Sequence, residues 1–382
     1  MSAQRGSPQF DVFSREAGFA PIAIVAIVGV LLAGGAGLFY LQRSTPSNST
    51  SLKTQSETQT KDSSQISFEA SDKKLLLTGG FADPSVIKLN DKYIMYVNKF
   101  GGGPSANLVY TSSDGIAWTD TGKKVPGAPT SRVFLMDGLV RLYYTTQVPI
   151  NPSDPPSQIL SAKSTDGINF INEEGIRVKP TDGYVIEGPS LIKTDSGYRL
   201  YFSEFKKEKP QERRDGKIFG ADSKDGLTWA RDAKPSIETT EVENASADWP
   251  QAIRPYVLKR PTGGFVLFYN THSKIYAALS DNGISWEKLG SIGIKGADSD
   301  GYYQPDGTIR FYYGDFSEKT SGVVYTAVLT ETKGKKADAP DKQPMENIKP
   351  FGTKPPPPPE CVGKKADDPN LSQSCQMWFK IQ

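Results

Sequence analysis

Histidine and cysteine are almost absent from this chain, which has one His and two Cys among its 382 residues. With a single histidine and no cysteine before residue 361, the common Ser-His-Asp and Cys-His catalytic triads are excluded. No glycine-rich phosphate-binding loop occurs either. The formal net charge is only +2 and no long basic run is present, so the sequence gives no support for nucleic-acid binding.

The two cysteines, Cys361 and Cys375, lie fourteen residues apart near the C-terminus. Without a neighbouring histidine they do not make a zinc site. Outside the cytoplasm, such a pair is expected to form a disulfide that closes a small loop. The surrounding segment 332–382 is polar and carries five consecutive prolines at 355–359, which predicts a disordered tail with polyproline II character.

Charged residues are also missing from Ala17 to Gln42, and most of this stretch is apolar. The length is sufficient for a helix to cross a bilayer about 30 Å thick. We predict a short cytoplasmic segment (1–18), a transmembrane helix (19–41) that acts as an uncleaved signal anchor, and a flexible polar stalk (42–67). The remainder is then attached to the membrane on its extracytoplasmic side.

Two other interpretations of this segment remain open. The small residues of the AGGAG stretch leave room for signal-peptide cleavage. The pair Gly18-Phe19 also resembles a prepilin leader, although Ala23 stands where pilins carry Glu. The arginines on both sides of the apolar run orient it only weakly.

Between these terminal segments, one phrase is repeated four times: an alternating apolar strand followed by Ser-x-Asp-Gly-x-x-Trp or a close variant. The glycines of the four copies, Gly115, Gly167, Gly226 and Gly283, are 52, 59 and 57 residues apart. Asp-Gly and Asn-Gly between strands favour tight turns, because both central turn positions prefer positive φ. A regular period of this length is typical of stacked supersecondary units.

Each copy follows two further strands, and a fifth set of strands ends without a turn phrase. Five units of four antiparallel strands predict an all-β fold, a five-bladed β-propeller over 68–331. The fifth unit lacks its outer strand, and we expect 73–77 to supply it and close the ring. An open sandwich or a prism is the alternative. Strand residues such as Tyr96, Tyr143, Tyr201 and Phe268 are predicted to fill the core between blades.

In a propeller, the start of each innermost strand and the end of the strand beside it lie at the same mouth of the central channel. The chemistry-bearing residues at these positions are therefore expected to meet: Asp83, Thr130 or Ser131, Glu187, Arg254 and Ser299 or Asp300 at strand starts, and Asn98, Lys99, Gln147, Glu204, His272 and Asp315 at second-strand ends.

The phrases FADPSVIKLNDKYIMYV from Phe81 and IEGPSLIKTDSGYRLYFS from Ile186 resemble the blade-opening segments of glycoside hydrolase family 43 and related arabinanase and invertase-type propellers. The resemblance covers about 73–330. It implies that Asp83 is the general base and Glu187 the general acid of an inverting glycosidase. Such an enzyme needs two carboxyl groups roughly 6.5–9.5 Å apart, one of them protonated.

The resemblance fails at the second blade, where the family carries an Asp that tunes the pKa of the acid. Here Thr130 or Ser131 occupies that place and cannot supply a charge. Asp300, Glu204 or Asp315 could substitute from a neighbouring blade. The invertase sequence Trp-x-Asn-Asp-Pro-Asn is also missing, which disfavours a sucrose-type substrate. Both motifs can also be ordinary turn chemistry at strand starts.

We therefore expect a membrane-anchored, monomeric carbohydrate-active protein. The first hypothesis is a glycosidase of arabinose- or xylose-type glycans, with Asp83 and Glu187 catalytic. Substrate contacts are predicted for Arg254, His272, Glu204, Asp300 and Asp315. No cofactor is required by this chemistry, although the channel leaves room for a Ca²⁺ ion. The alternative is a non-catalytic propeller that binds a glycan or a protein partner through the same mouth.

Overall fold

The computed structural model describes residues 66–333, except for 101–105, 128–129, 147–148, 150, 209, 211, 240–249, 273 and 317–321. The predicted membrane helix, most of the stalk and the cysteine-bearing tail lie outside these residues. Within the described ranges, every regular element is a β-strand, and no helix is long and apolar enough to cross a bilayer.

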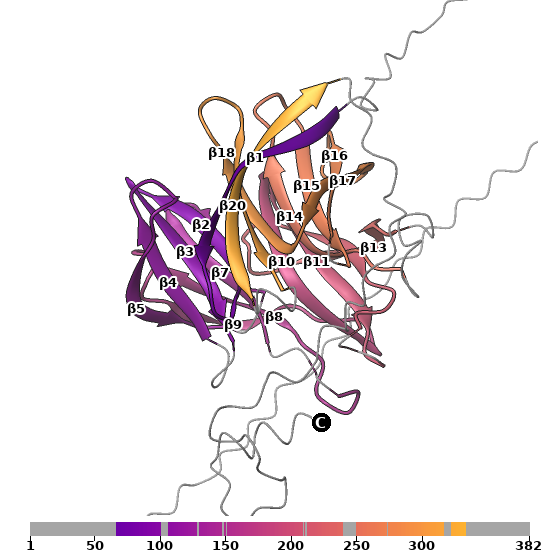
Figure 1. Cartoon of the computed structure of the whole chain (residues 1–382). Helices are drawn as coiled ribbons and strands as arrows, with labels where there is room; N and C mark the ends of the chain where they lie inside the picture. Colours follow the sequence, from indigo (N-terminus) through magenta and orange to yellow (C-terminus); the bar gives the residue numbers. More distant parts are fainter. Residues whose placement is uncertain are drawn as a thin grey trace, which may run out of the picture. The chain divides into compact units, whose positions relative to one another are not determined.

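Twenty strands form five antiparallel sheets of four strands each, arranged around a common centre (Figure 1). The first three blades, from the innermost strand outward, are β2 (Phe81–Leu89), β3 (Lys92–Lys99), β4 (Ala106–Ser112) and β5 (Thr119–Val125); β6 (Arg132–Met136), β7 (Leu139–Thr145), β8 (Ile159–Ser164) and β9 (Ile171–Val178); and β10 (Tyr184–Thr194), β11 (Gly197–Lys206), β12 (Lys217–Ser223) and β13 (Ala230–Ile237).

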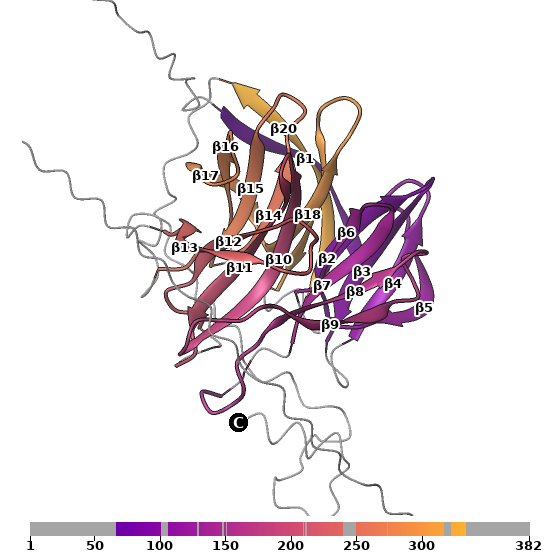
Figure 2. The same cartoon turned by 180° about the vertical axis from the view of Figure 1, so that it is seen from behind.

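The last two blades are β14 (Ile253–Lys259), β15 (Phe265–Thr271), β16 (Lys274–Ser280) and β17 (Glu287–Lys295); and β18 (Ala297–Tyr303), β19 (Ile309–Asp315), β20 (Val323–Lys333) and β1 (Ile66–Leu77). The predicted five-bladed propeller is therefore confirmed. The innermost strands contact one another in a ring, with β18 of the fifth blade against β2 of the first (Figure 2).

The ring is closed by the N-terminal strand, as the sequence predicts. β1 pairs antiparallel with β20, with Leu75 opposite Tyr325, and becomes the outer strand of the fifth blade. It begins at Ile66, earlier than the predicted start at Lys73, and has bulges between Ser71 and Lys74 and between Leu75 and Leu77. One blade thus contains both ends of the repeat region, which ties the first blade to the last.

The repeated phrase forms the turn between the third and fourth strand of four blades, with the same hydrogen bonds each time. In the first copy, the Ser112 hydroxyl accepts a hydrogen bond from Gly115 N at 2.9 Å, and Asp114 Oδ1 accepts from Ile116 N at 2.8 Å and from Ala117 N at 2.9 Å. The glycine φ is +74°, a left-handed value that explains the choice of glycine.

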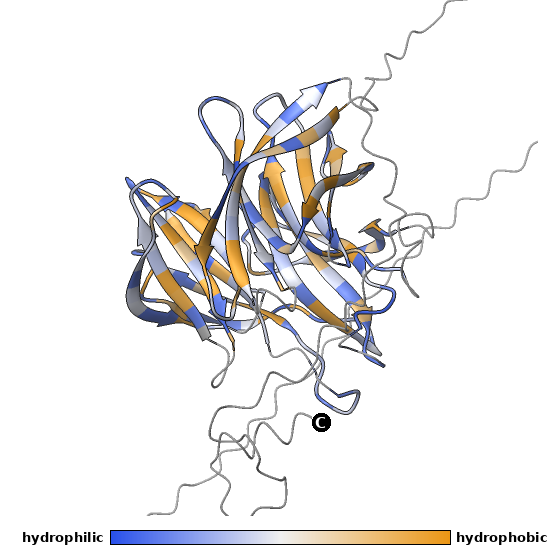
Figure 3. Cartoon of the chain, viewed as in Figure 1, coloured by the Kyte–Doolittle hydropathy of each residue, from blue (hydrophilic) through white to orange (hydrophobic). Residues whose placement is uncertain are grey.

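Tyrosines fasten each turn to the preceding blade. Their hydroxyls donate to the turn glycine carbonyls in four pairs: Tyr96 to Gly167, Tyr143 to Gly226, Tyr201 to Gly283 and Tyr312 to Gly115. The fourth blade has Phe268 in this position, and its neighbour is the fifth blade, which has no turn phrase. Phe268 instead packs edge-on against Phe68 and Phe311, with ring centroids 5.3 Å and 5.0 Å away. Along the strands, hydrophobic and hydrophilic residues are interspersed (Figure 3).

Candidate functional site at the channel mouth

Four of the five innermost strands begin with the same backbone irregularity, and β6 of the second blade does not. The strand pairing shifts register between Ala82 and Ser85, Glu187 and Ser190, Ile253 and Tyr256, and Ala297 and Asp300. One left-handed residue marks this place in every blade: Asp83 (φ 51°), Thr130 (φ 68°), Gly188 (φ 66°), Arg254 (φ 56°) and Asp298 (φ 59°). A bulge bends the strand and redirects its side chain, so these positions present functional groups at the mouth.

Side chains of the preceding blade support the strained backbone. Gly188 N donates to Thr130 Oγ1 at 3.2 Å, Arg254 N to Ser203 Oγ at 2.6 Å, and Asp298 N to Asn270 Oδ1 at 3.2 Å. A left-handed non-glycine residue costs on the order of 1–3 kcal/mol and persists only when its surroundings fix it. These hydrogen bonds between blades provide that constraint.

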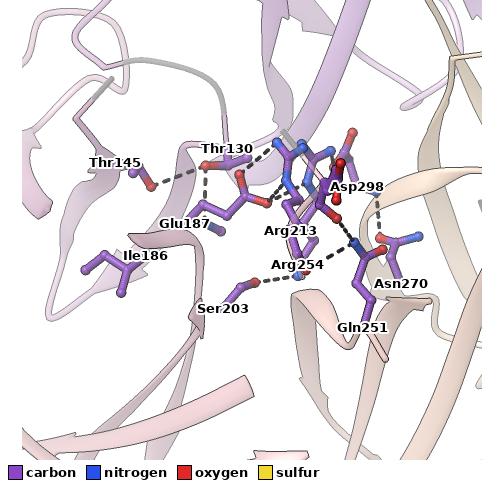
Figure 4. Close-up of polar contacts among 12 residues, drawn as sticks. Thr130, Thr145, Ile186, Glu187, Ser203, Arg213, Gln251, Arg254, Asn270 and Asp298 are labelled. Carbon is purple, nitrogen blue, oxygen red and sulfur yellow. Dashed lines mark hydrogen bonds and ion pairs between the residues drawn. The ribbon is translucent and has the colours of Figure 1, made fainter. Parts of the chain in front are cut away.

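Arg254 contacts three carboxylates at the mouth, of which Glu187 and Asp298 are labelled in Figure 4. Its Nε lies 3.2 Å from Glu187 Oε1, its Nη1 forms an ion pair with Asp298, and the same nitrogen is 3.8 Å from Asp83 Oδ1. All four side chains are buried. The structure thus brings together Asp83, Glu187 and Arg254, which the sequence predicts to meet, and adds Asp298, which the sequence analysis missed.

Glu187 is held by a second arginine that the sequence analysis also missed. Arg213 lies between β11 and β12, and its Nε and Nη2 donate to Glu187 Oε1 and Oε2 at 2.6 Å and 3.1 Å. Burial raises the pKa of Glu187, but the charges and hydrogen bonds of Arg213 and Arg254 outweigh it and lower the pKa to about 2. Glu187 is therefore an ionised carboxylate.

The pKa of Asp83, in contrast, is raised. Burial and the negative charge of Asp298 raise the pKa of Asp83, and the charges of Arg254 and Arg132 only partly oppose this. Among the described residues, Asp83 Oδ1 has no hydrogen-bond partner. The protonated form of Asp83 is therefore favoured below about pH 7.

The second blade contributes hydroxyl groups in place of a carboxylate. Thr130 Oγ1 lies 3.2 Å from Thr145 Oγ1 and accepts the hydrogen bond from Gly188, the residue after Glu187. Ser131 Oγ accepts from Asn107 Nδ2 at 3.1 Å. Thr130 therefore supports the backbone beside Glu187 but adds no charge to it.

Asp300 and Glu204, two of the possible substitutes, have other partners. Asp300 Oδ1 accepts from Val86 N at 3.0 Å, and its Oδ2 lies 3.7 Å from Arg132 Nε. Glu204 binds both terminal nitrogens of Arg231, at 2.8 Å and 2.6 Å.

The surroundings of these two carboxylates differ. Burial raises the pKa of Asp300 to about 7, although Arg132 and the Val86 amide oppose this. Glu204 also accepts from Thr181 N at 2.8 Å and lines a cavity of about 640 Å³ on the third blade, together with Tyr184 and Phe219.

The remaining predicted residues end second strands. Asp315 is the last residue of β19, is half-buried, and pairs in register with Val323. His272 follows β15 with a left-handed φ of 52°, and its backbone N donates to Gln251 Oε1 at 3.1 Å. Gln251 Nε2 in turn donates to the Arg213 carbonyl at 3.5 Å, so His272 borders the segment that carries Arg213.

The described part of the chain contains no group of three or more His, Cys, Asp or Glu residues that could hold a metal ion. Instead, the guanidinium of Arg132 crosses from the second blade to the fifth. It donates to Ser299 O at 3.2 Å, and its Nε faces Asp300.

No family model and no curated protein matches this chain. Solved structures do match, at low identity. An endo-1,4-beta-xylanase from Bacteroides thetaiotaomicron is 18% identical, with 69% of this chain and 96% of that chain covered and a TM-score of 0.50. A family 117 glycoside hydrolase from the marine bacterium Zobellia galactanivorans is 13% identical, with 72% and 93% covered and a TM-score of 0.50.

A third match has a different chemistry. An N-acetylgalactosamine deacetylase from F. plautii, in complex with blood group B trisaccharide, is 12% identical, with 70% of this chain and 95% of that chain covered and a TM-score of 0.50. The predicted resemblance is confirmed at the level of the fold: this chain has the five-bladed propeller of glycoside hydrolases. Because one fold carries several activities, the function has to be argued from the site.

Proposed function

We propose that this chain is a membrane-tethered, extracytoplasmic propeller that binds a glycan at its channel mouth without hydrolysing it. The observation that carries the proposal is the double ion pair of Glu187 with Arg213 and Arg254. An inverting glycosidase needs a general acid that holds its proton near the working pH. With a pKa of about 2, only about one Glu187 in 10⁵ is protonated at pH 7.

The protonation of Asp83 also argues against hydrolysis. The base of an inverting glycosidase must be ionised to activate water. Burial and Asp298 instead favour the protonated form of Asp83. Glu187 is therefore ionised where hydrolysis requires an acid, and about half of Asp83 is protonated at pH 7 where hydrolysis requires a base. The second blade offers Thr130 rather than a third carboxylate.

Support for a carbohydrate ligand comes from the fold and from the character of the mouth. The structural matches include enzymes named for xylan and for glycosides, and one was solved with a trisaccharide. Charged side chains that can accept and donate several hydrogen bonds surround the mouth, as is usual for polyhydroxylated ligands. The tether is argued from the apolar segment 19–41, and no part of that segment belongs to the described residues.

One observation favours the second candidate function, an inverting glycoside hydrolase of arabinose- or xylose-type glycans. Asp83 and Glu187 lie at the same mouth and share Arg254, as the family resemblance implies. Their catalytic roles remain a prediction. In this case, substrate binding has to move a proton onto Glu187.

Binding and turnover measured on the same ligands separate the two functions. We expect arabino- and xylo-oligosaccharides or their acidic derivatives to bind the full-length chain, with no reducing ends released on prolonged incubation. Turnover that Asp83→Asn and Glu187→Gln each abolish, while Glu331→Gln leaves it intact, would establish the hydrolase instead. Glu331 is a suitable control because it also pairs bidentately with an arginine, Arg260, but on the blade edge away from the mouth.

A further inference from the structure

Of the two arginines on Glu187, Arg213 is the outer one. Its side chain is 12% exposed, whereas the carboxylate that it covers is fully buried. Arg213 belongs to the connection between β11 and β12, outside the strand ladder. A ligand that enters the mouth above Glu187 therefore meets the Arg213 guanidinium before it meets the carboxylate.

Arg254, in contrast, is fixed in place. It lies in the β14 bulge, its backbone N donates to Ser203, and its guanidinium also binds Asp298 and approaches Asp83. If Arg213 left Glu187, the carboxylate would retain Arg254 as its partner at 3.2 Å. If Arg213 moved from Glu187 to another anion, the Glu187 carboxylate would thus still be paired with a positive charge.

We propose that Arg213 recognises the carboxylate of a uronic-acid-bearing glycan and exchanges Glu187 for that ligand carboxylate. This names the ligand class of the glycan-binding function proposed above and rests on it. The planar guanidinium already holds one carboxylate in two parallel hydrogen bonds, at 2.6 Å and 3.1 Å. The same fork fits a hexuronate, whereas a neutral sugar cannot replace the charge that Arg213 would lose.

The exchange is expected to be coupled to a proton, because Arg213 and Arg254 are the two arginines that contact the carboxyl groups of Glu187, Asp298 and Asp83. A ligand carboxylate adds one negative charge in a buried, weakly screened environment. Uptake of a proton by Asp83 offsets this charge, so acidic ligands bind more weakly as the pH rises.

Other charged groups around the mouth have partners of their own. Asp300, whose pKa burial raises to about 7, lies 3.7 Å from Arg132 and accepts a hydrogen bond from Val86 N. The backbone N of His272 donates to Gln251. The proton is expected on Asp83, because Asp83 and Glu187 share Arg254.

The test is calorimetric titration of the full-length chain with tetragalacturonate and with its carboxyl-reduced form, at pH 6 and pH 8. We expect the acidic tetramer to bind about ten- to a hundredfold more tightly than the reduced one, which is the usual value of hydrogen bonds to charged groups. Titration in two buffers of different ionisation enthalpy should reveal uptake of up to one proton, for the acidic tetramer alone.

Arg213→Gln should remove this preference and the proton uptake, and Arg213→Lys should retain only part of the preference because it cannot form the fork. Arg260→Gln is the matched control, because it removes a bidentate arginine–glutamate pair remote from the mouth. The comparison of the two tetramers on the unmodified chain needs no variant, so a poorly folded Arg213→Gln leaves the test valid.

The outcomes separate the inference from the function on which it rests. Equal binding of acidic and reduced tetramers, or an acidic preference that survives Arg213→Gln, overturns the role of Arg213 but leaves glycan binding intact. Binding of neither tetramer, nor of neutral arabino- or xylo-oligosaccharides, overturns both.

Discussion

Replacement of Glu187 by glutamine distinguishes a protonated acid from an ionised partner of two arginines. A protonated carboxylic acid and an amide are nearly the same in shape and charge, so the substitution would hardly change the stability of a catalytic acid. Here the amide instead removes the charge that Arg213 binds with two hydrogen bonds and Arg254 with one. Arg254 keeps Asp298, whereas Arg213 loses its ion pair with Glu187 and at least one of the two hydrogen bonds, because the amide offers a single acceptor oxygen.

The magnitude follows from the pKa. A reduction from 4.5 to about 2 corresponds to about 3 kcal/mol, at about 1.36 kcal/mol per pH unit. Removal of one partner of a buried ion pair typically costs about 3–5 kcal/mol, which agrees. For a propeller of this size, the melting temperature should fall by roughly 6–12 °C.

The pH dependence gives an internal check. A lowered folded-state pKa contributes stability that is present above pH 4.5 and is lost as the pH falls towards about 2. The difference between wild type and Glu187→Gln in urea denaturation should therefore be constant from pH 5 to 8 and shrink near pH 3. Glu331→Gln should cost about 1 kcal/mol or less, because the Glu331 side chain is 21% exposed whereas that of Glu187 is fully buried. A Glu187→Gln variant as stable as wild type would refute the argument and restore Glu187 as a candidate acid.

Other predictions test the charge of Asp83, the contacts between blades and the membrane topology. The raised pKa of Asp83, about 7 in the folded state, contributes stability that is present below pH 3.8 and lost as the pH rises through about 7. Wild type should therefore lose roughly 2.5 kcal/mol more than Asp83→Asn between pH 5 and 8 in urea titrations; parallel pH profiles would contradict this. Tyr143→Phe should cost about 1 kcal/mol by removing the donor to Gly226, and Phe268→Tyr about 1–3 kcal/mol by burying a hydroxyl with no turn carbonyl to receive it; a neutral Phe268→Tyr would show that a partner exists. Protease treatment of intact cells should release the propeller by cleavage within 44–67, whereas a propeller cut only after lysis would contradict the extracytoplasmic orientation.

The sequence by itself determined the architecture, because the information is local and repeated. Turn phrases at a steady period define the blades, and alternation of apolar residues defines the strands. The missing outer strand of the last unit, together with the spare strand near Lys73, was enough to predict the closure that β1 and β20 make. Even the substitution of Phe268 for tyrosine agrees with the missing turn in the fifth blade.

The sequence also placed Asp83, Glu187 and Arg254 at one mouth, because strand order alone decides which strand ends share a face. It did not identify Asp298, since it assigned the opening of the fifth blade to Ser299 or Asp300. Alignment of the blade openings could have identified Asp298. Asp298 occupies the same bulge position as Asp83, whereas Ser299 and Asp300 follow that position. A one-residue difference in register moves a side chain to another face.

Only the tertiary structure decided the charge state of the site. Arg213 comes from an irregular connection with no periodic pattern, and nothing in the sequence relates it to Glu187, 26 residues away. A carboxyl group in a buried site takes its pKa from whichever charges the fold places within a few ångströms. The repeat encodes where Glu187 lies, but the contacts made by Arg213 and Arg254 determine that it is ionised.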